Sequence, residues 1–156
     1  MRNSALLILL TVCGPATLAA QTPDLTQVLK QRVTAFQSAW NAHDAAAVTA
    51  FFTTDGDLIM EDGPTVQGKA ALQQWWHDRF AEVTTTTAIT LTVRAVRPIA
   101  PDVVLLNALA KVSGDPPQGR TMGSNEDRGT WVLVRQGGQW FISALRVQQV
   151  ERPAGR

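Results

Sequence analysis

The sequence predicts one α+β domain in which helices come first and a long antiparallel sheet follows. Three observations predict this class. Apolar residues recur at helical spacing before residue 84, whereas β-branched and alternating residues dominate the chain after it. The run Gln136-Gly137-Gly138 joins two alternating segments and is typical of a β-hairpin. Helices followed by consecutive strands are the order found in α+β proteins.

Residues 1–20 are predicted to be a secretory signal peptide, which leaves a single mature domain at residues 21–156. Arg2 gives the segment a positive start, residues 5–12 form an apolar run, and small residues close it at residues 16–20. The apolar run is shorter than the roughly 20 residues that cross a bilayer. We therefore expect an exported protein, periplasmic or secreted.

Composition excludes several kinds of chemistry. Cys13 is the only cysteine, so the mature chain has no disulfide, thiol nucleophile or cysteine metal site. A lipid anchor on Cys13 is the alternative to secretion, although Val12 before it fits that signal poorly. Of the 14 basic residues one, Arg2, lies in the predicted signal peptide, and the others balance the 13 acidic residues. We therefore expect no nucleic acid, no membrane after signal removal and no cofactor as partners.

Three helices are predicted. Residues 24–40 carry apolar side chains at helical spacing, namely Leu25, Val28, Leu29, Val33, Phe36 and Trp40. Residues 41–44 interrupt this pattern, and Asp44 can cap a second helix over residues 45–52 because its carboxylate accepts a hydrogen bond from a free backbone N–H. Residues 69–83 form the third helix, which follows a glycine.

Five strands are predicted, over residues 57–61, 84–97, 103–112, 126–135 and 139–150. The first ends at the turn Asp62-Gly63-Pro64 and lies between the second and third helices. Residues 98–101, which contain two prolines, separate the second strand from the third. A loop rich in glycine and proline is predicted at residues 113–124, and the sequence leaves open whether it covers a binding site.

Four motifs in this order carry a resemblance to a known superfamily. They read WNAHD from residue 40, FFTTDGD from residue 51, GKAAL from residue 68 and WVLVRQGGQW from residue 131. Over residues 25–149 the chain resembles the nuclear transport factor 2-like superfamily, and more narrowly its bacterial SnoaL-like and ketosteroid-isomerase-like members. The resemblance implies a cystatin-like cone, a curved antiparallel sheet wrapped around three N-terminal helices. It also implies a homodimer paired through sheet faces.

The resemblance raises the hypothesis of an isomerase, cyclase or dehydratase that acts on a steroid- or polyketide-like substrate. Such isomerases use a carboxylate base beside a carbonyl and donors that hold the enolate. Aligned without gaps, the family's tyrosine falls on Phe36, its base on Met60 and its second aspartate near Thr130. None of these side chains keeps the required chemistry. Asp62 is a weak candidate for a relocated catalytic base, and an ordinary turn aspartate is the favoured interpretation.

The two histidines do not predict a metal site. His43 and His77 are each followed by an aspartate, but they lie in different predicted helices and form no ligand spacing. His43 is explained as a residue of the corner between helices, and His77 as a surface residue. We therefore predict no metal.

The favoured function is the binding of a small apolar or aromatic molecule in an apolar, cone-shaped pocket. The expected lining residues are Phe36, Trp40, Met60, Trp75 and Thr130. By strand alternation, one face carries Trp140, Ile142, Ala144, Arg146 and Gln148, and another carries Arg128 with Thr130. If these faces turn inward, Arg146 or Arg128 holds a polar group of the ligand; if they turn outward, both are surface charges. A third possibility is an interaction module whose core is filled by its own tryptophans.

Overall fold

The computed structural model describes residues 24–61, 63–83, 86–114 and 126–150, and these ranges form three helices and one sheet. In chain order the elements are α1 (Leu25–Asn41), α2 (Ala45–Thr49), β1 (Phe52–Met60), β2 (Val66–Gln67), α3 (Lys69–Glu82), β3 (Ala88–Ala100), β4 (Val103–Ser113), β5 (Glu126–Gln136) and β6 (Gln139–Gln149). The predicted α+β class is confirmed. The predicted signal peptide, Asp62 and residues 115–124 of the predicted loop lie outside the described residues.

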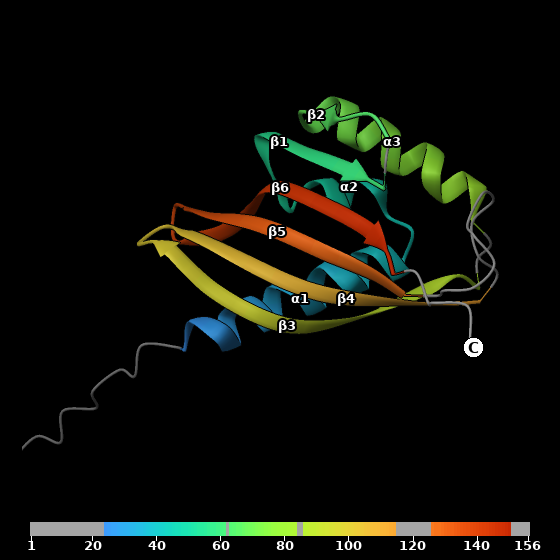
Figure 1. Cartoon of the computed structure of the whole chain (residues 1–156). Coiled ribbons are helices and arrows are strands. Elements are labelled where there is room, and N and C mark those ends of the chain that lie inside the picture. Colours follow the sequence, from blue (N-terminus) through green and yellow to red (C-terminus); the bar gives the residue numbers. More distant parts are fainter. Residues whose placement is uncertain (1–23, 62, 84–85, 115–125, 151–156) are drawn as a thin grey trace, which may run out of the picture.

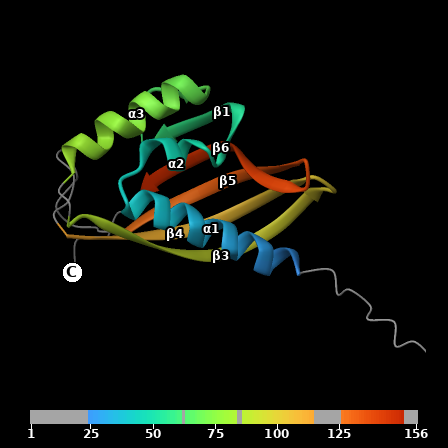
Figure 2. The ribbon, with the colours of Figure 1, turned by 180° about the vertical axis from the view of Figure 1, so that it is seen from behind.

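The sheet has six strands in the order β2-β1-β6-β5-β4-β3. Strands β3 to β6 form an antiparallel meander, β1 pairs in parallel with β6, and β2 is a short antiparallel partner of β1. Figures 1 and 2 show the sheet curving along α1, with α3 beyond the β1 side. In the ranges described, no helix has the length and apolar character needed to cross a membrane.

The first predicted strand begins five residues earlier than expected, at Phe52, and the short strand β2 was not predicted. Two other differences concern the end of the second helix and the break after the second predicted strand. The second helix ends at Thr49, and Phe52, predicted as its last residue, begins β1 with its side chain fully buried. β3 continues through Pro98 to Ala100, where a break was predicted at residues 98–101. Because β3 is an edge strand, Pro98 removes no hydrogen bond that the sheet requires.

The end of α1 and the corner after it cover the beginning of the edge strand β3. Asn41 Nδ2 donates to Ile89 O at 3.0 Å, and Ile89 N donates to Asn41 Oδ1 at 2.8 Å. Leu91 N donates to Gln37 Oε1 at 2.7 Å, and His43 Nε2 lies 3.0 Å from Thr87 O. An uncovered edge strand exposes unpaired backbone groups, so these side chains occupy the place of a further strand.

The predicted cap of α2 is confirmed, because Ala47 N donates to Asp44 Oδ1 at 2.9 Å. His43 before it has a φ of 53°, in the left-handed region. That conformation is uncommon for a residue with a side chain, and it turns the chain sharply between the two helices. The corner therefore ends α1 where Asn41 can reach β3 and His43 can reach Thr87, just before that strand.

Asn41→Ala is expected to lower the free energy of unfolding by about 1–3 kcal/mol, because two hydrogen bonds worth about 0.5–1.5 kcal/mol each are lost. Urea unfolding followed by circular dichroism measures the change. Gln31→Ala, at an exposed position of the same helix, is the control and should change stability by less than about 0.5 kcal/mol. Equal effects of the two variants would contradict this role for Asn41.

A candidate ligand-binding cavity

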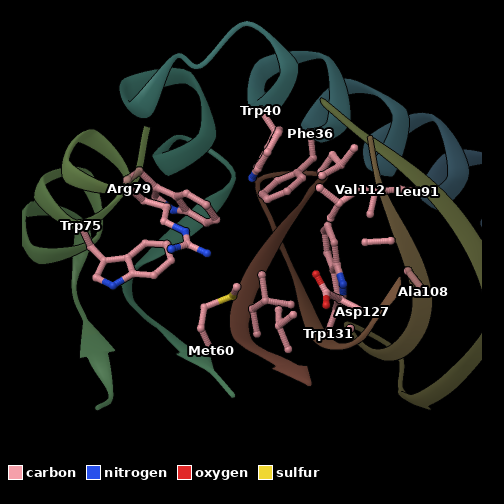
Figure 3. Close-up of a pocket in the computed structure, with 16 residues that line it drawn as sticks. Phe36, Trp40, Met60, Trp75, Arg79, Leu91, Ala108, Val112, Asp127 and Trp131 are labelled. Atoms are coloured by element: carbon pink, nitrogen blue, oxygen red, sulfur yellow. The ribbon is translucent and has the colours of Figure 1, made fainter. Parts of the chain in front are cut away.

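A cavity of about 70 Å³, open on one side, lies between the inner face of the sheet and the helices (Figure 3). Helices α1 and α3 supply one wall, and strands β1, β3, β4, β5 and β6 supply the other. Its lining residues are Phe36, Trp40, Met60, Trp75, Trp76, Arg79, Ile89, Leu91, Ala108, Ala110, Val112, Asp127, Gly129, Trp131, Leu145 and Val147. The structure therefore leaves an opening inside the cone, and the tryptophans do not fill it.

The helix wall is held by contacts between aromatic rings. The Phe36 ring centre lies 4.9 Å from that of Trp131 and 6.4 Å from that of Trp76, both edge to face. Trp40 packs edge to face on Phe80 at 5.5 Å, and Phe80 stacks on Trp76 at 5.6 Å. Edge-to-face and offset-stacked pairs are the preferred geometries of aromatic rings. This network fixes the positions of the rings that face the cavity.

The sheet wall leaves space because three of its lining residues are small. Ala108 and Ala110 of β4 and Gly129 of β5 line the cavity, and none of them carries more than a methyl group into it. A Cβ atom at Gly129 would lie 2.7 Å from Trp131 Nε1, closer than any normal contact. Glycine at this position therefore allows the Trp131 indole to lie against the strand.

Two lining side chains carry charge. Asp127 on β5 is 5% exposed, and the Arg79 side chain on α3 is 24% exposed. Figure 3 shows the two side chains reaching toward the cavity from opposite walls. Arg79 Nη1 also lies 3.4 Å from Oε2 of Glu82, one turn further along α3. A carboxylate and a guanidinium thus face an otherwise apolar space.

Four of the predicted lining residues, Phe36, Trp40, Met60 and Trp75, line the cavity together. Sequence reasoning missed both charged lining residues. Asp127 precedes Trp131 by an even number of positions on β5, so strand alternation places the two side chains on the same face. Arg79 follows Trp75 and Trp76 by about one helical turn, so all three share a helix face. Alternation on β5 is the signal that could have found Asp127, whereas the spacing on α3 relates Arg79 to the tryptophans without selecting the inward face.

The predicted lining role of Arg146 is wrong, because a bulge in β6 reverses the alternation. Val132 pairs with Ala144 but Leu133 pairs with Ile142, so Ser143 is an extra residue in β6. Leu145 and Val147 consequently face the cavity, and Arg146 points to the outer face. There its guanidinium forms a bidentate ion pair with Asp57, and the second contact, from Nη2 to Oδ2, measures 3.1 Å.

This ion pair raises the pKa of Arg146 above its ordinary value, because the hydrogen bond to the Asp57 carboxylate favours the charged form. Burial lowers the pKa of another arginine, Arg32 of α1, whose Nε donates to Trp140 O at 2.9 Å. Its guanidinium carbon lies 4.2 Å from the Phe51 ring centre. Neither arginine lines the cavity, so neither is available to a ligand there.

Thr130 and Arg128 also turn away from the cavity. Thr130 Oγ1 donates to Asn107 Oδ1 at 3.2 Å on the outer face of the sheet, and Arg128 is exposed. They alternate with Asp127 and Gly129, which face inward. The predicted lining role of Thr130 is therefore wrong, and of the two orientations considered for Arg128 the outward one holds.

Within the described residues, no group of three histidine, cysteine, aspartate or glutamate side chains is arranged to hold a metal ion. His77 is exposed, and its Nδ1 lies 3.3 Å from Asp78 Oδ1. His43 packs against both Trp40 and Phe80, with ring centres 5.7 and 5.3 Å away. Neither histidine lines the cavity.

The comparisons with known proteins agree with this geometry. The sequence model of a family described as SnoaL-like domain matches residues 29–145. No curated protein matches the chain.

Three solved structures show the same fold. A domain of unknown function with a cystatin-like fold from Nostoc punctiforme has a TM-score of 0.70 and 18% identity, and the match covers 81% of this chain and 78% of that one. A ketosteroid isomerase-like protein from Erwinia carotovora atroseptica has a TM-score of 0.67, 18% identity and coverage of 81% and 96%. An NTF2-like protein of unknown function from Pseudomonas putida has a TM-score of 0.61, 19% identity and coverage of 77% and 82%.

Proposed function

The chain belongs to the SnoaL-like domain family, and we propose that it binds a small apolar or aromatic molecule in the cavity described above. The observation that carries the proposal is an opening walled by aromatic and aliphatic side chains, with one carboxylate and one guanidinium facing it. An apolar pocket with a few placed polar groups is the usual form of a small-molecule site.

The volume favours a ligand with a single ring. A dry cavity of about 150 Å³ accommodates benzene, so about 70 Å³ encloses only part of one ring. The rest of the ligand would lie at the open side, where Met60, Trp75 and Arg79 are half-buried. A molecule with several fused rings, such as a steroid, exceeds this space unless these side chains move.

Asp127 supports a second candidate function, an isomerase, cyclase or dehydratase with a relocated carboxylate base. A general base must lie within hydrogen-bond reach of the proton that it removes. Asp127 is the lining carboxylate in the described part of the chain, and Gly129 and Trp131 line the cavity from the same strand. This candidate uses the same cavity as the binding function and places the base on β5.

Export and pairing of two copies belong to the same proposal. The segment at residues 1–20 has the pattern of a signal peptide, which supports a periplasmic or secreted protein.

The outer face of the sheet carries half-buried aliphatic side chains, including Leu105, Leu109, Val132 and Val134, and these support a homodimer. Light scattering of the mature chain tests the pairing, and a monomer would contradict it.

Ala110→Leu tests the binding site, because the larger side chain would occupy the cavity from β4. Isothermal titration calorimetry with p-cresol, a neutral single-ring probe, is expected to show affinity at least about ten-fold weaker than that of the unchanged chain; a loss of about 1.4 kcal/mol corresponds to this factor. Ala144→Leu, a half-buried alanine of β6 outside the cavity, is the matched control and should bind normally. Equal binding by both variants would refute the proposal.

A further inference from the structure

Opposite charges on the two walls of the cavity distinguish it from a purely apolar pocket. Arg79 reaches in from α3 and Asp127 from β5, and Figure 3 shows them facing each other across the space. The other lining side chains are aliphatic, aromatic or a thioether, apart from the glycine on β5. A bound molecule therefore meets a cation on one side and an anion on the other, with apolar surface between them.

Resting on the proposed function, we propose that the ligand class is an aromatic acid. Such a molecule has one ring, a carboxylate that binds Arg79 and a hydrogen-bond donor, such as a hydroxyl, that binds Asp127. The polarity of each wall sets the orientation of the ligand, with its acidic end toward α3 and its donor end toward β5.

Arg79 suits the carboxylate because a guanidinium offers five N–H donors in a planar fork that matches two carboxylate oxygens. Its contact with Glu82 is a long one, at 3.4 Å between two side chains near the surface, with Glu82 58% exposed. Exposed pairs of this kind are weak. The guanidinium therefore retains donors for a ligand at the open side of the cavity.

Asp127 suits a donor because an ionised carboxylate accepts hydrogen bonds at about four lone-pair positions. Asp127 already has an interaction within the chain, and a carboxylate with one partner can accept a further donor beside it. At 5% exposure the carboxylate is shielded from water, and a hydrogen bond to a charged acceptor is stronger than a neutral one. A hydroxyl or amine on the ring would supply such a donor.

The apolar walls suit the ring. Phe36, Trp75 and Trp131 face the space between the two charges, and an aromatic ligand can meet their rings edge to face. An aliphatic acid of the same length would keep the contact with Arg79 but lose these aromatic contacts. The three recognition elements together define the class of ligand.

The test uses three probes that differ by one group each: 4-hydroxyphenylacetate, its neutral primary amide, and phenylacetate without the hydroxyl. Calorimetric titration of the full mature chain is expected to show that the hydroxylated acid binds at least ten-fold more tightly than the amide. It should also bind several-fold more tightly than phenylacetate. Arg79→Gln should abolish the preference for acid over amide while leaving the affinity for the amide unchanged.

Arg128→Gln is the matched control, because this arginine lies on the opposite face of the sheet next to Asp127 and should keep the full preference. Asp127→Asn should weaken the distinction between 4-hydroxyphenylacetate and phenylacetate and leave the preference for acid over amide in place. Circular dichroism of each variant verifies that it is folded before titration.

Equal affinities for acid and amide in the unchanged chain would overturn the inference, and so would a preference that survives Arg79→Gln. Binding of p-cresol without binding of any acid would overturn the inference and leave the proposed function standing. Absence of binding by p-cresol and by all three probes would refute both.

Discussion

Phe36→Ala is expected to lower the free energy of unfolding by about 3–5 kcal/mol, the loss typical of a large aromatic side chain removed from a core. Phe36 is 3% exposed and lies at the centre of the aromatic network. Its ring contacts those of Phe51, Trp76 and Trp131 edge to face, with centres 5.5, 6.4 and 4.9 Å away. The variant loses these contacts as well as its buried apolar area. Urea unfolding followed by circular dichroism gives the change.

Phe141→Ala is the control for this prediction. Phe141 is half-buried on β6 and contacts the guanidinium of Arg32, whose carbon lies 5.3 Å from its ring centre. Its removal leaves no enclosed space, so we expect less than half of the loss caused by Phe36→Ala. A change below about 2 kcal/mol for Phe36→Ala would show that the surrounding rings collapse into the space, because the cost of truncation depends on how well a site closes.

The helices and the order of the elements could be predicted because they depend on local pattern. The apolar spacing of residues 24–40 identified Leu29, Val33, Phe36 and Trp40, and these are the four buried residues of α1. The carboxylate of Asp44 identified the start of α2, since capping needs only one side chain and the next backbone turn. Both patterns depend only on residues that are close together in the sequence, so they can be recognised without knowing the tertiary structure.

The orientation of β6 could not be predicted, because it depends on a bulge at Ser143. Alternation from Trp140 places Arg146 on the inner face, and one extra residue moves it to the outer face. Nothing in the local sequence marks the position, since the bulge is set by pairing with β5 on one side and β1 on the other. The same change brings Leu145 and Val147 to the cavity.

The two charged residues of the cavity could be predicted only in part. Asp127 could have been placed inside by alternation from Trp131, because β5 has no irregularity between the two positions. Arg79 shares a helix face with Trp75 and Trp76. However, α3 carries charged and aromatic residues on several of its sides, so its sequence pattern alone does not show which face turns inward. That Arg79 and Asp127 face each other depends on how α3 sits against the sheet, which no local pattern specifies.

Gly129→Ala is expected to destabilise the protein by about 1–3 kcal/mol, the usual cost of overpacking a core. The added methyl group would lie 2.7 Å from Trp131 Nε1 and 3.3 Å from Trp131 Cδ1, so the indole must move. Trp131 is 3% exposed and packs against Phe36, and the cavity is the open space beside it. The indole should therefore shift into the cavity, and calorimetry with p-cresol should show affinity at least about ten-fold weaker, equivalent to about 1.4 kcal/mol.

A clash with the Trp131 indole can be distinguished from a general intolerance of side chains at position 129 by making Gly129→Ala in a protein that also carries Trp131→Leu. Leucine has no atom at the position of the indole nitrogen, so the methyl group that Gly129→Ala adds no longer meets it in the double variant. In a strand, alanine then has an advantage over glycine of roughly 0.5–1 kcal/mol, because glycine loses more backbone freedom on folding. Gly129→Ala is thus expected to destabilise the protein when Trp131 is present and to be neutral or stabilising when leucine replaces it. The coupling energy from urea unfolding of the four proteins should reach about 0.5–3 kcal/mol, as for residues in direct contact; additive effects would mean that the indole does not determine the requirement for glycine.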